Sequence, residues 1–279
     1  MLLARFVRKS ASTSQQQQQQ RRRLARPCFS AVLQPSKSDP QIAPPAPPSS
    51  SSSSPCRTPY VIGVAGGTAS GKTSVCKAIM ERLVADGDVD EQRVAMFSQD
   101  SFYRNLTAQE REHGVRDFNF DHPEAFDLVD MSTQLEGLRD GAEGRVPSYD
   151  YVTSSRRPET ESRVLRGSAL DVVLVDGILL FTDYDGGRLR SCFDLKVFVD
   201  VEADTRLARR IRRDVEERGR DVKNVLQQYE LTVKPSFDTF VSPTKKHADL
   251  IVPRGAENVA AIDMMVEHVK SRCKSSTTV

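Results

Sequence analysis

Short apolar runs recur along the chain from residue 60 onward, and longer stretches with helical spacing of their apolar residues separate them. The runs are rich in β-branched residues. Short runs of this composition are typical of strands buried on both faces of a sheet. We therefore predict strands at residues 61–65, 93–98, 171–176, 195–200 and 250–252.

The stretches between these runs favour helices. After the first run, Val75, Ile79 and Leu83 recur every four residues, which places them on one face of a helix. Similar spacing predicts helices around residues 131–138 and at 204–217, 222–234 and 257–273. Apolar strands that alternate with amphipathic helices predict an α/β fold, in which helices cover both faces of a parallel sheet.

The first 59 residues have a different composition. Between residues 10 and 59 the chain consists mainly of Gln, Ser, Pro and Arg, with one run of six glutamines and one of six serines. Such a segment cannot bury enough apolar surface to offset the entropy lost on ordering. We predict a disordered low-complexity tail at residues 1–59 and a folded domain at residues 60–274.

The start of this tail bears on location. The first nine residues contain three basic side chains and no acid, and serines follow, a pattern that resembles an organelle transit peptide. An untargeted low-complexity extension is the alternative that this pattern leaves open. The expected location is cytoplasmic, or plastid or mitochondrial if the tail is a transit peptide.

Charge and composition exclude several classes of protein. The tail holds nine of the 40 Lys and Arg side chains but one of the 38 Asp and Glu, so the remaining 220 residues carry a formal net charge of −6. An acidic body argues against nucleic acid as a partner, and no apolar run is long enough for a transmembrane helix. The five cysteines and four histidines show no zinc-ligand spacing. We expect no nucleic-acid partner, no membrane partner and no structural zinc.

A phosphate-binding motif lies between the first predicted strand and its helix. Residues 66–73 match G-x-x-x-x-G-K-[ST] without a mismatch. Its glycines let the backbone curl so that successive N–H groups point at phosphate oxygens, the lysine charge reaches the β and γ phosphates, and the threonine hydroxyl ligates Mg²⁺. A chance glycine-rich turn, the alternative, would lack this context. The predicted ATP-binding residues here are Gly66, Gly67, Thr68, Ala69, Ser70, Gly71, Lys72, Thr73 and Ser74.

Two acids follow predicted strands. Asp176 closes the strand at 171–176, where a carboxylate would hold the metal, and Asp100 follows the strand at 93–98 at the same edge of the sheet. An acid that caps the next helix is the common alternative for each position. Two such acids on strands flanking a P-loop favour a metal ligand and a general base. Thr73, Asp100 and Asp176 are the predicted metal-site residues.

Seven stretches extend the pattern beyond residues 66–74. They lie at residues 98–103, 118–123, 149–151, 204–207, 218–221, 243–246 and 253–256. On these stretches, residues 60–270 closely resemble the uridine–cytidine kinase family of P-loop nucleoside kinases. The resemblance implies a P-loop NTPase fold with a basic helical lid and a small β-hairpin at the nucleoside site, and it suggests a homotetramer.

The resemblance also implies an activity, which is transfer of the γ-phosphoryl of ATP, with Mg²⁺, to the 5′-hydroxyl of uridine or cytidine in pyrimidine salvage. Asp100 matches the family's general base, and together with Lys72 and Arg213 it makes up the predicted catalytic set. Glu257 matches an acid near the nucleotide. The implied nucleoside contacts are Tyr103, Phe120, Asp121, Tyr149, Tyr151, Ser154, Ile178, Arg210, Arg220 and Gln228.

The predicted helix at 204–217 is strongly basic. At 100° per residue, four arginines gather on one side and the apolar residues on the other. A charge run alone favours a solvated face, and a nucleic-acid stripe is disfavoured by the acidic body. Beside a P-loop, we favour a lid whose arginines neutralise the transferring phosphoryl. These arginines are Arg206, Arg209, Arg210 and Arg213.

Aromatic residues alternate with acids and amides in two of the matching stretches. Phe118 and Phe120 stand among Asp117, Asn119 and Asp121, and Tyr149 and Tyr151 flank an aspartate. Taken singly, such aromatic residues belong more often to a core than to a pocket. Together with the acids they favour a half-polar binding wall, in which a planar base gains roughly 1–3 kcal/mol per stacking partner.

The chain departs from the family pattern at two positions. Ser154 stands where the family usually has a histidine that contacts the base, which leaves the uridine/cytidine preference open. Asp176 stands where the family has a glutamate, a change of one methylene. Two alternatives to a pyrimidine nucleoside kinase are another small-molecule P-loop kinase, of ribulose phosphate or pantothenate type, and a nucleotide-binding module without catalysis.

Overall fold

The computed structural model describes residues 58–275, except residues 86, 88, 115–117 and 152. The disordered tail and the transit peptide predicted from the sequence fall on residues that lie almost entirely outside this range. The described region contains the whole of the predicted folded domain, residues 60–274, apart from the six excepted positions, and it includes three residues beyond it, Thr58, Pro59 and Ser275.

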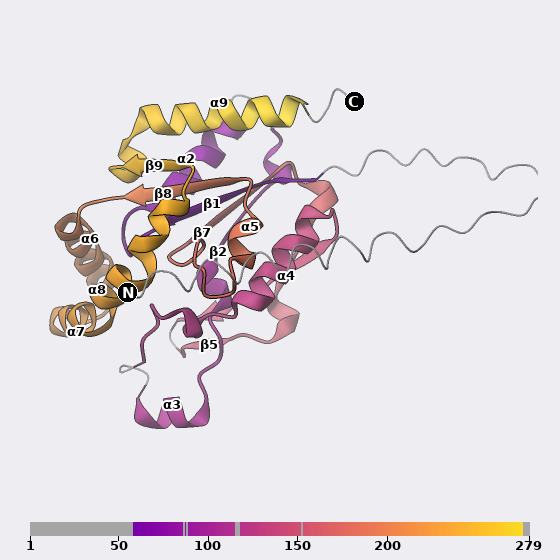
Figure 1. Cartoon of the computed structure of the whole chain (residues 1–279). Coiled ribbons are helices and arrows are strands. Elements are labelled where there is room, and N and C mark those ends of the chain that lie inside the picture. Colours follow the sequence, from indigo (N-terminus) through magenta and orange to yellow (C-terminus); the bar gives the residue numbers. More distant parts are fainter. Residues whose placement is uncertain (1–57, 86, 88, 115–117, 152, 276–279) are drawn as a thin grey trace, which may run out of the picture. The chain divides into compact units, whose positions relative to one another are not determined.

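A five-stranded parallel sheet forms the centre of the described region (Figure 1). Its strands lie in the order β2-β7-β1-β8-β9, and each neighbouring pair is parallel. Every strand predicted from an apolar run is confirmed to within one residue at either end. The bounds are β1 Tyr60–Gly66, β2 Val94–Ser98, β7 Val172–Gly177, β8 Leu195–Asp200 and β9 Leu250–Pro253.

The two strands that carry the acids do not both flank the P-loop strand β1, as the sequence analysis assumed. Strand β7 pairs with β1, β2 pairs with the far side of β7, and β8 occupies the other side of β1. After β1 the chain forms β2 at the edge of the sheet, and it later returns to insert β7 between β2 and β1. No local sequence pattern encodes this connection. Ser98 pairs with Asp176 in register, so Asp176 near the end of β7 and Asp100 just after β2 still lie at one edge of the sheet.

Alternate residues of each strand enter different cores. Val61 and Val173 point to the face covered by α4 (Leu128–Arg139) and α5 (Arg188–Ser191). Ile62 and Leu174 point to the face covered by α2 (Lys72–Ala85) and α9 (Val259–Ser275). The helices predicted at 131–138 and 257–273 are confirmed. Burial on both faces explains why the strands are continuously apolar.

The chain beyond β8 is largely helical up to β9. The helices predicted at 204–217 and 222–234 are confirmed, but the second includes a π-helical segment and the helical path runs on to His247. The elements are α6 Ala203–Glu216, α7 Val222–Gln228, π-helical η7 Tyr229–Val233, α8 Lys234–Ser236, π-helical η8 Phe237–Val241 and 3₁₀-helical η9 Ser242–His247.

The charged face of α6 is its buried face. Arg206, Arg210 and Asp214 are buried, whereas Leu207 and Ile211 are only half-buried. The Arg206 guanidinium lies 3.9 Å from the centre of the Phe237 ring and donates to the carbonyl of Val201 at 3.0 Å. The interpretation of this face as solvated is therefore wrong.

Smaller elements complete the described region. Two antiparallel strand pairs stand apart from the main sheet, β3 Glu143–Val146 with β6 Arg163–Arg166 and β4 Tyr149–Asp150 with β5 Ser155–Arg156. Helix α3 spans Ala108–His113. The 3₁₀ turns are η2 Glu91–Arg93, η3 Gln99–Phe102, η4 Pro123–Ala125, η5 Glu159–Glu161, η6 Gly167–Ala169 and η10 Gly255–Glu257. Within the described residues, no helix has the length and apolar character needed to span a membrane.

Candidate active site

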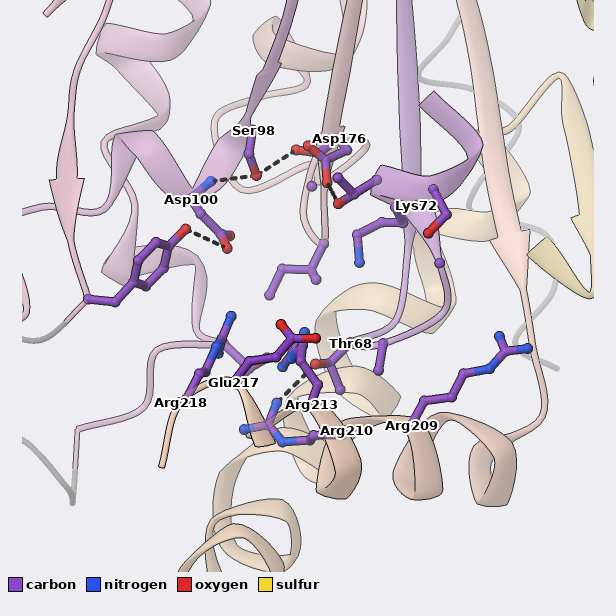
Figure 2. Close-up of a pocket in the computed structure, with 18 of the residues that line it drawn as sticks. Thr68, Lys72, Ser98, Asp100, Asp176, Arg209, Arg210, Arg213, Glu217 and Arg218 are labelled. Carbon is purple, nitrogen blue, oxygen red and sulfur yellow. Dashed lines mark hydrogen bonds between the residues drawn. The ribbon is translucent and has the colours of Figure 1, made fainter. Parts of the chain in front are cut away.

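A cavity of about 820 Å³ opens at the carboxyl edge of the sheet, beside the point where the strand order reverses at β1. Open α/β folds bind their ligands at this switch point. Figure 2 shows the two sides of the cavity, with Lys72, Asp100 and Asp176 facing arginines of α6 and the turn after it. The P-loop, the strand-end acids and the basic helix therefore surround one space.

The P-loop has the backbone conformation that its glycines permit. Gly71 has a φ of +90° and Gly66 a φ of +149°. A Cβ at Gly66 would lie 2.6 Å from the carbonyl oxygen of Val199, so a larger residue there would clash with β8. The loop leads directly into the N-terminus of α2, where free N–H groups favour an anion.

Lys72 lies buried at the first position of α2. Its Nζ donates to the carbonyl of Gly67 at 2.9 Å, which holds the ammonium group inside the curve of the loop. Burial lowers the pKa of Lys72, while the charges of Asp176 and Asp100 oppose that shift. The group is thus placed as a partly desolvated cation beside the cavity.

Asp176 meets the P-loop across the strand ends. The Thr73 hydroxyl donates to its Oδ2 at 2.5 Å, and its Oδ1 is buried without a hydrogen-bond partner among the described residues. A buried carboxylate oxygen that lacks a donor suits a cation. Among the described residues, no group of three or more His, Cys, Asp or Glu side chains is arranged to hold a metal ion by itself, but Mg²⁺ needs only one or two carboxylates beside substrate phosphates. The residues present fit a magnesium ion.

Asp100 lies in the 3₁₀ turn η3 after β2. Its backbone N–H donates to Ser98 Oγ at 3.3 Å, and its Oδ2 accepts from the Tyr151 hydroxyl at 3.3 Å. Burial raises the pKa of Asp100, and the nearby charge of Asp176 raises it further, whereas Lys72 lowers it. A carboxylate with a raised pKa is a stronger base than an exposed aspartate.

Aromatic side chains form one wall of the cavity. The Tyr103 ring stacks on Phe126 with centroids 4.3 Å apart and meets the ring of Phe120 edge-on at 5.6 Å. Tyr149 lies 5.2 Å from Tyr103 and 5.4 Å from Tyr151, on the hairpin β4–β5. Tyr103, Phe120, Tyr149 and Tyr151 thus line the cavity as contacting, mutually tilted rings, and Asp100 lines it with them.

Arginines form the opposite wall. Arg210 donates to Thr68 Oγ1 at 2.9 Å and to Gln228 Oε1 at 2.8 Å, which ties α6 to the P-loop and to α7. Arg209 pairs with Glu257 at 2.6 Å. Burial lowers the pKa of Arg210, and the charges of Asp121 and Asp214 raise it. The lid helix predicted from the sequence lies over the phosphate-binding loop.

Most of the predicted site residues line this single cavity. Gly66, Gly67 and Ser70 of the loop are buried and do not line it. The predicted residues that do are Thr68, Ala69, Gly71, Lys72, Thr73, Ser74, Asp100, Tyr103, Phe120, Asp121, Tyr149, Tyr151, Ser154, Asp176, Ile178, Arg210, Arg213, Arg220, Gln228 and Glu257.

Further residues line the cavity without having been predicted in the site. Arg218 has its guanidinium carbon 5.5 Å from the centre of the Tyr151 ring. Arg218 and Arg254 stand in stretches that carry the family resemblance, so the sequence held a signal for both. Lys77 and Glu217 have no such signal, since each is one polar residue among many on a helix surface or its end.

A P-loop at the switch point of a parallel sheet, with strand-end acids on one side and a basic helix on the other, defines a P-loop kinase of small molecules. The family model described as phosphoribulokinase/uridine kinase matches residues 61–261. The chain belongs to the phosphoribulokinase/uridine kinase family, and the family resemblance drawn from the sequence is confirmed.

The chain is similar to curated proteins over about four fifths of its length. It is 48% identical over 225 residues to a chloroplastic uridine/cytidine kinase of Arabidopsis thaliana, covering 81% of this chain and 44% of that protein. It is 48% identical over 214 residues to uridine-cytidine kinase B of Dictyostelium discoideum, covering 77% of this chain and 82% of that protein. The chain thus spans less than half the length of the Arabidopsis relative.

A solved structure supports the fold. Phosphoribulokinase from Rhodobacter spheroides matches with a TM-score of 0.52 at 16% sequence identity, covering 70% of each chain. At this identity the likeness shows the fold alone, and it agrees with the predicted α/β class.

Proposed function

We propose that this chain is an ATP-dependent uridine–cytidine kinase, which transfers the γ-phosphoryl of ATP to the 5′-hydroxyl of the nucleoside and yields UMP or CMP. The observation that carries the proposal is the single cavity in which a P-loop, a strand-end carboxylate with a raised pKa and an aromatic wall face one another. The names of the two relatives at 48% identity support a pyrimidine nucleoside as the acceptor.

The phosphate end of the reaction belongs to the P-loop and the basic helix. Backbone N–H groups at the start of α2 and the ammonium group of Lys72 bind the β and γ phosphates of ATP. Arg213 acts on the phosphoryl group in transit, where negative charge spreads over its oxygens. The position of Arg213 opposite Lys72 supports this role.

Asp100 accepts the proton of the attacking 5′-hydroxyl. Its raised pKa favours proton transfer from the hydroxyl as the new O–P bond forms, and the Tyr151 hydroxyl keeps the carboxylate oriented. Proximity contributes as well, because the aromatic wall holds the nucleoside beside the carboxylate. The hydroxyl oxygen thereby attacks the γ-phosphoryl group, ADP leaves, and the hydroxyl proton passes to the Asp100 carboxylate.

The nucleoside occupies the side of the cavity lined by Tyr103, Phe120 and the hairpin. Aromatic faces stack on the pyrimidine. Asp121, whose pKa burial raises and Arg210 lowers, accepts from the ribose hydroxyls. A ribulose phosphate would instead require cationic partners at this end, and the aromatic lining disfavours it.

Thr73, Asp176 and Asp100 would hold Mg²⁺, and the unpaired Oδ1 of Asp176 supports that placement. Bound there, Mg²⁺ would supply positive charge that neutralises the negative charge developing on the phosphates during transfer.

Assembly and location are also part of the proposal. We expect a homo-oligomer, a tetramer by family resemblance, which light scattering on the purified full chain tests. We expect a plastid location, supported by the basic, acid-free start of the chain and by the chloroplastic relative. Fusion of residues 1–59 to a fluorescent protein tests it, and a diffuse cytoplasmic signal would contradict it.

Transfer of ³²P from γ-labelled ATP across a panel of acceptors tests the activity. The panel contains uridine, cytidine, thymidine, adenosine, ribulose 5-phosphate and pantothenate. We expect labelled UMP or CMP and at least about tenfold less product from every other acceptor. Labelling of a non-nucleoside acceptor alone, or of none, would overturn the proposal.

A matched pair of lysine variants accompanies this assay. Lys72→Met should lower turnover by about a hundredfold or more, because the phosphates lose their buried cation. Lys223→Met removes an exposed lysine at the start of α7 that does not line the cavity, and it should leave turnover within about twofold.

A further inference from the structure

Asp214 is a buried acid in the most arginine-rich helix of the chain. It lies near the C-terminal end of α6, and none of its side chain is exposed. It does not line the cavity and belongs to no role assigned above. A carboxylate taken fully out of water requires strong partners.

The partners of Asp214 are four arginines that all line the cavity. Its Oδ1 accepts from Arg213 Nε at 2.9 Å and lies 3.5 Å from Arg218 Nη1. Its Oδ2 accepts from Arg220 Nη1 at 3.2 Å and lies 3.8 Å from Arg210 Nε. We call Arg210, Arg213, Arg218 and Arg220 the arginine cluster.

The backbone of Asp214 adds a second tie. Its carbonyl accepts from the backbone N–H of Arg220 at 2.9 Å, which folds the turn after α6 back onto the helix. Arginines from the helix and from the turn are thereby brought to one point. Arg210 and Arg220 also share Gln228 Oε1, at 2.8 and 3.4 Å.

Charge explains why this anchor matters. Four guanidinium groups around one carboxylate leave a formal charge of +3, and in its absence their mutual repulsion would drive the side chains apart and toward water. Burial tends to raise the pKa of Asp214, but the charges of Arg213 and Arg210 outweigh it and hold that pKa below its ordinary value. The anchor therefore stays ionised through the neutral range.

We propose that Asp214 is a positioning residue for phosphoryl transfer, whose buried carboxylate holds the arginine cluster in place facing the P-loop before substrate arrives. Figure 2 shows three members, Arg210, Arg213 and Arg218, side by side across the cavity from Lys72. Charges fixed in advance stabilise a transition state better than charges that must be gathered during the reaction. The proposal rests on the proposed kinase function.

Asp214→Asn tests it, because the amide keeps the shape and removes the charge. We expect kcat to fall by about 30-fold or more while KM for ATP changes by less than about threefold, because the P-loop and Lys72 hold the bound nucleotide. Glu216→Gln is the matched control, with the same charge change on the same helix at an exposed position that does not line the cavity. The control should retain kcat within about twofold.

A double-mutant cycle separates positioning from a merely structural role. If Asp214 acts through the cluster, Asp214→Asn should cost at least about fivefold less in an Arg213→Ala background than in the wild type. Additive effects in this cycle, or a kcat of Asp214→Asn within about threefold of wild type, would overturn the proposal.

A second variant covers the case in which Asp214→Asn does not fold, and a separate assay tests the proposed kinase function. If Asp214→Asn does not fold, Asp214→Glu retains the charge and displaces it by a methylene, and the same cycle is run with it. Wild-type transfer to uridine or cytidine tests the proposed function separately. If no acceptor is phosphorylated, the cycle is run on phosphate release from ATP without acceptor, so the failure of one proposal is distinguished from failure of the other.

Discussion

Single side chains at the candidate site differ chiefly in their surroundings. Asp100 and Asp176 both lie at the carboxyl ends of parallel strands, Asp100 just after β2 and Asp176 near the end of β7. Asp100 accepts from Tyr151 and has a pKa raised by burial, whereas Asp176 accepts from Thr73 and has one oxygen without a hydrogen-bond partner among the described residues. The first environment suits a base, and the second suits a metal ligand.

Removing the base gives the first residue-scale prediction. Asp100→Asn should lower kcat by about 10²–10⁴ and leave ATP binding nearly intact, as loss of a general base would. Asp263→Asn, on the exposed side of α9, is a control of equal charge change. Steady-state kinetics and calorimetric titration with ATP measure both effects. A loss below tenfold in a folded protein would show that the role of Asp100 is assigned wrongly.

The hydrogen bond from Tyr151 predicts a shift in pH dependence. Its hydroxyl donates to the charged form of Asp100 and so lowers the pKa of Asp100, against the larger effect of burial. In Tyr151→Phe that pKa should rise, so the acid limb of kcat/KM should move to higher pH. A pH series from 5 to 8 on both proteins measures it, and an acid limb that stays in place or moves to lower pH would contradict the prediction.

Ser154 predicts a change in nucleoside affinity. It lines the cavity beside the phenol of Tyr149, at a φ of +50° that histidine tolerates better than most residues. Ser154→His should lower KM for uridine or cytidine by about three- to tenfold, the effect of one hydrogen bond, and change kcat little. Kinetics with both nucleosides measure it. An unchanged KM for both would place Ser154 away from the base.

At the scale of elements, several short segments depend on specific caps and ties. Helix α3 begins with a capping box, in which Thr107 accepts from the Glu110 N–H and the Glu110 carboxylate accepts from the Thr107 N–H. Arg104 adds two hydrogen bonds to the same carboxylate, at 2.8 and 2.6 Å. A helix of six residues has little intrinsic stability, so these contacts hold it.

The capping box of α3 predicts that the protection of the α3 amides against hydrogen exchange depends on pH. The hydrogen bond from Arg104, followed by that from the Thr107 N–H, lowers the pKa of Glu110 to about 2 from an ordinary 4.5. Because the pKa of Glu110 is lower in the folded state, the Glu110 carboxylate stabilises α3 fully above about pH 4.5, and this stabilisation is lost as the pH falls toward 2.

Hydrogen exchange measures that contribution. Amides of α3 should exchange faster in Glu110→Gln than in the wild type at pH 6, and the difference should disappear toward pH 2. Glu112→Gln, at an exposed position of the same helix, is the control and should exchange like the wild type. Equal exchange in Glu110→Gln and the wild type at pH 6 would show that the cap does not stabilise α3.

At the scale of the whole molecule, the tail has few apolar side chains to contribute to a core, because residues 10–59 consist mainly of Gln, Ser, Pro and Arg. A protein lacking residues 1–57 should therefore keep its melting temperature within about 1–2 °C and its kinase activity within about twofold. Differential scanning calorimetry and the phosphate-transfer assay measure these quantities. A cooperative loss of several degrees would show that the tail packs on the domain.

The sequence by itself determined the elements and the chemistry that depends on local spacing. Strand β1, helix α2 and the loop between them follow from period and glycine placement, which act within a few residues. Lys72 and Asp100 could be predicted as site residues because each stands in a contiguous motif, residues 66–73 and 98–103.

Only the tertiary structure decided which distant residues meet. It placed β7 between β1 and β2, buried the charged face of α6 and set Asp214 among four arginines. The physical reason is that burial and ion pairing depend on the neighbours that chain crossings supply. A charged helix face that is exposed to water and one that packs against a phosphate-binding loop have the same sequence pattern. Only the tertiary neighbours of the helix distinguish the two cases.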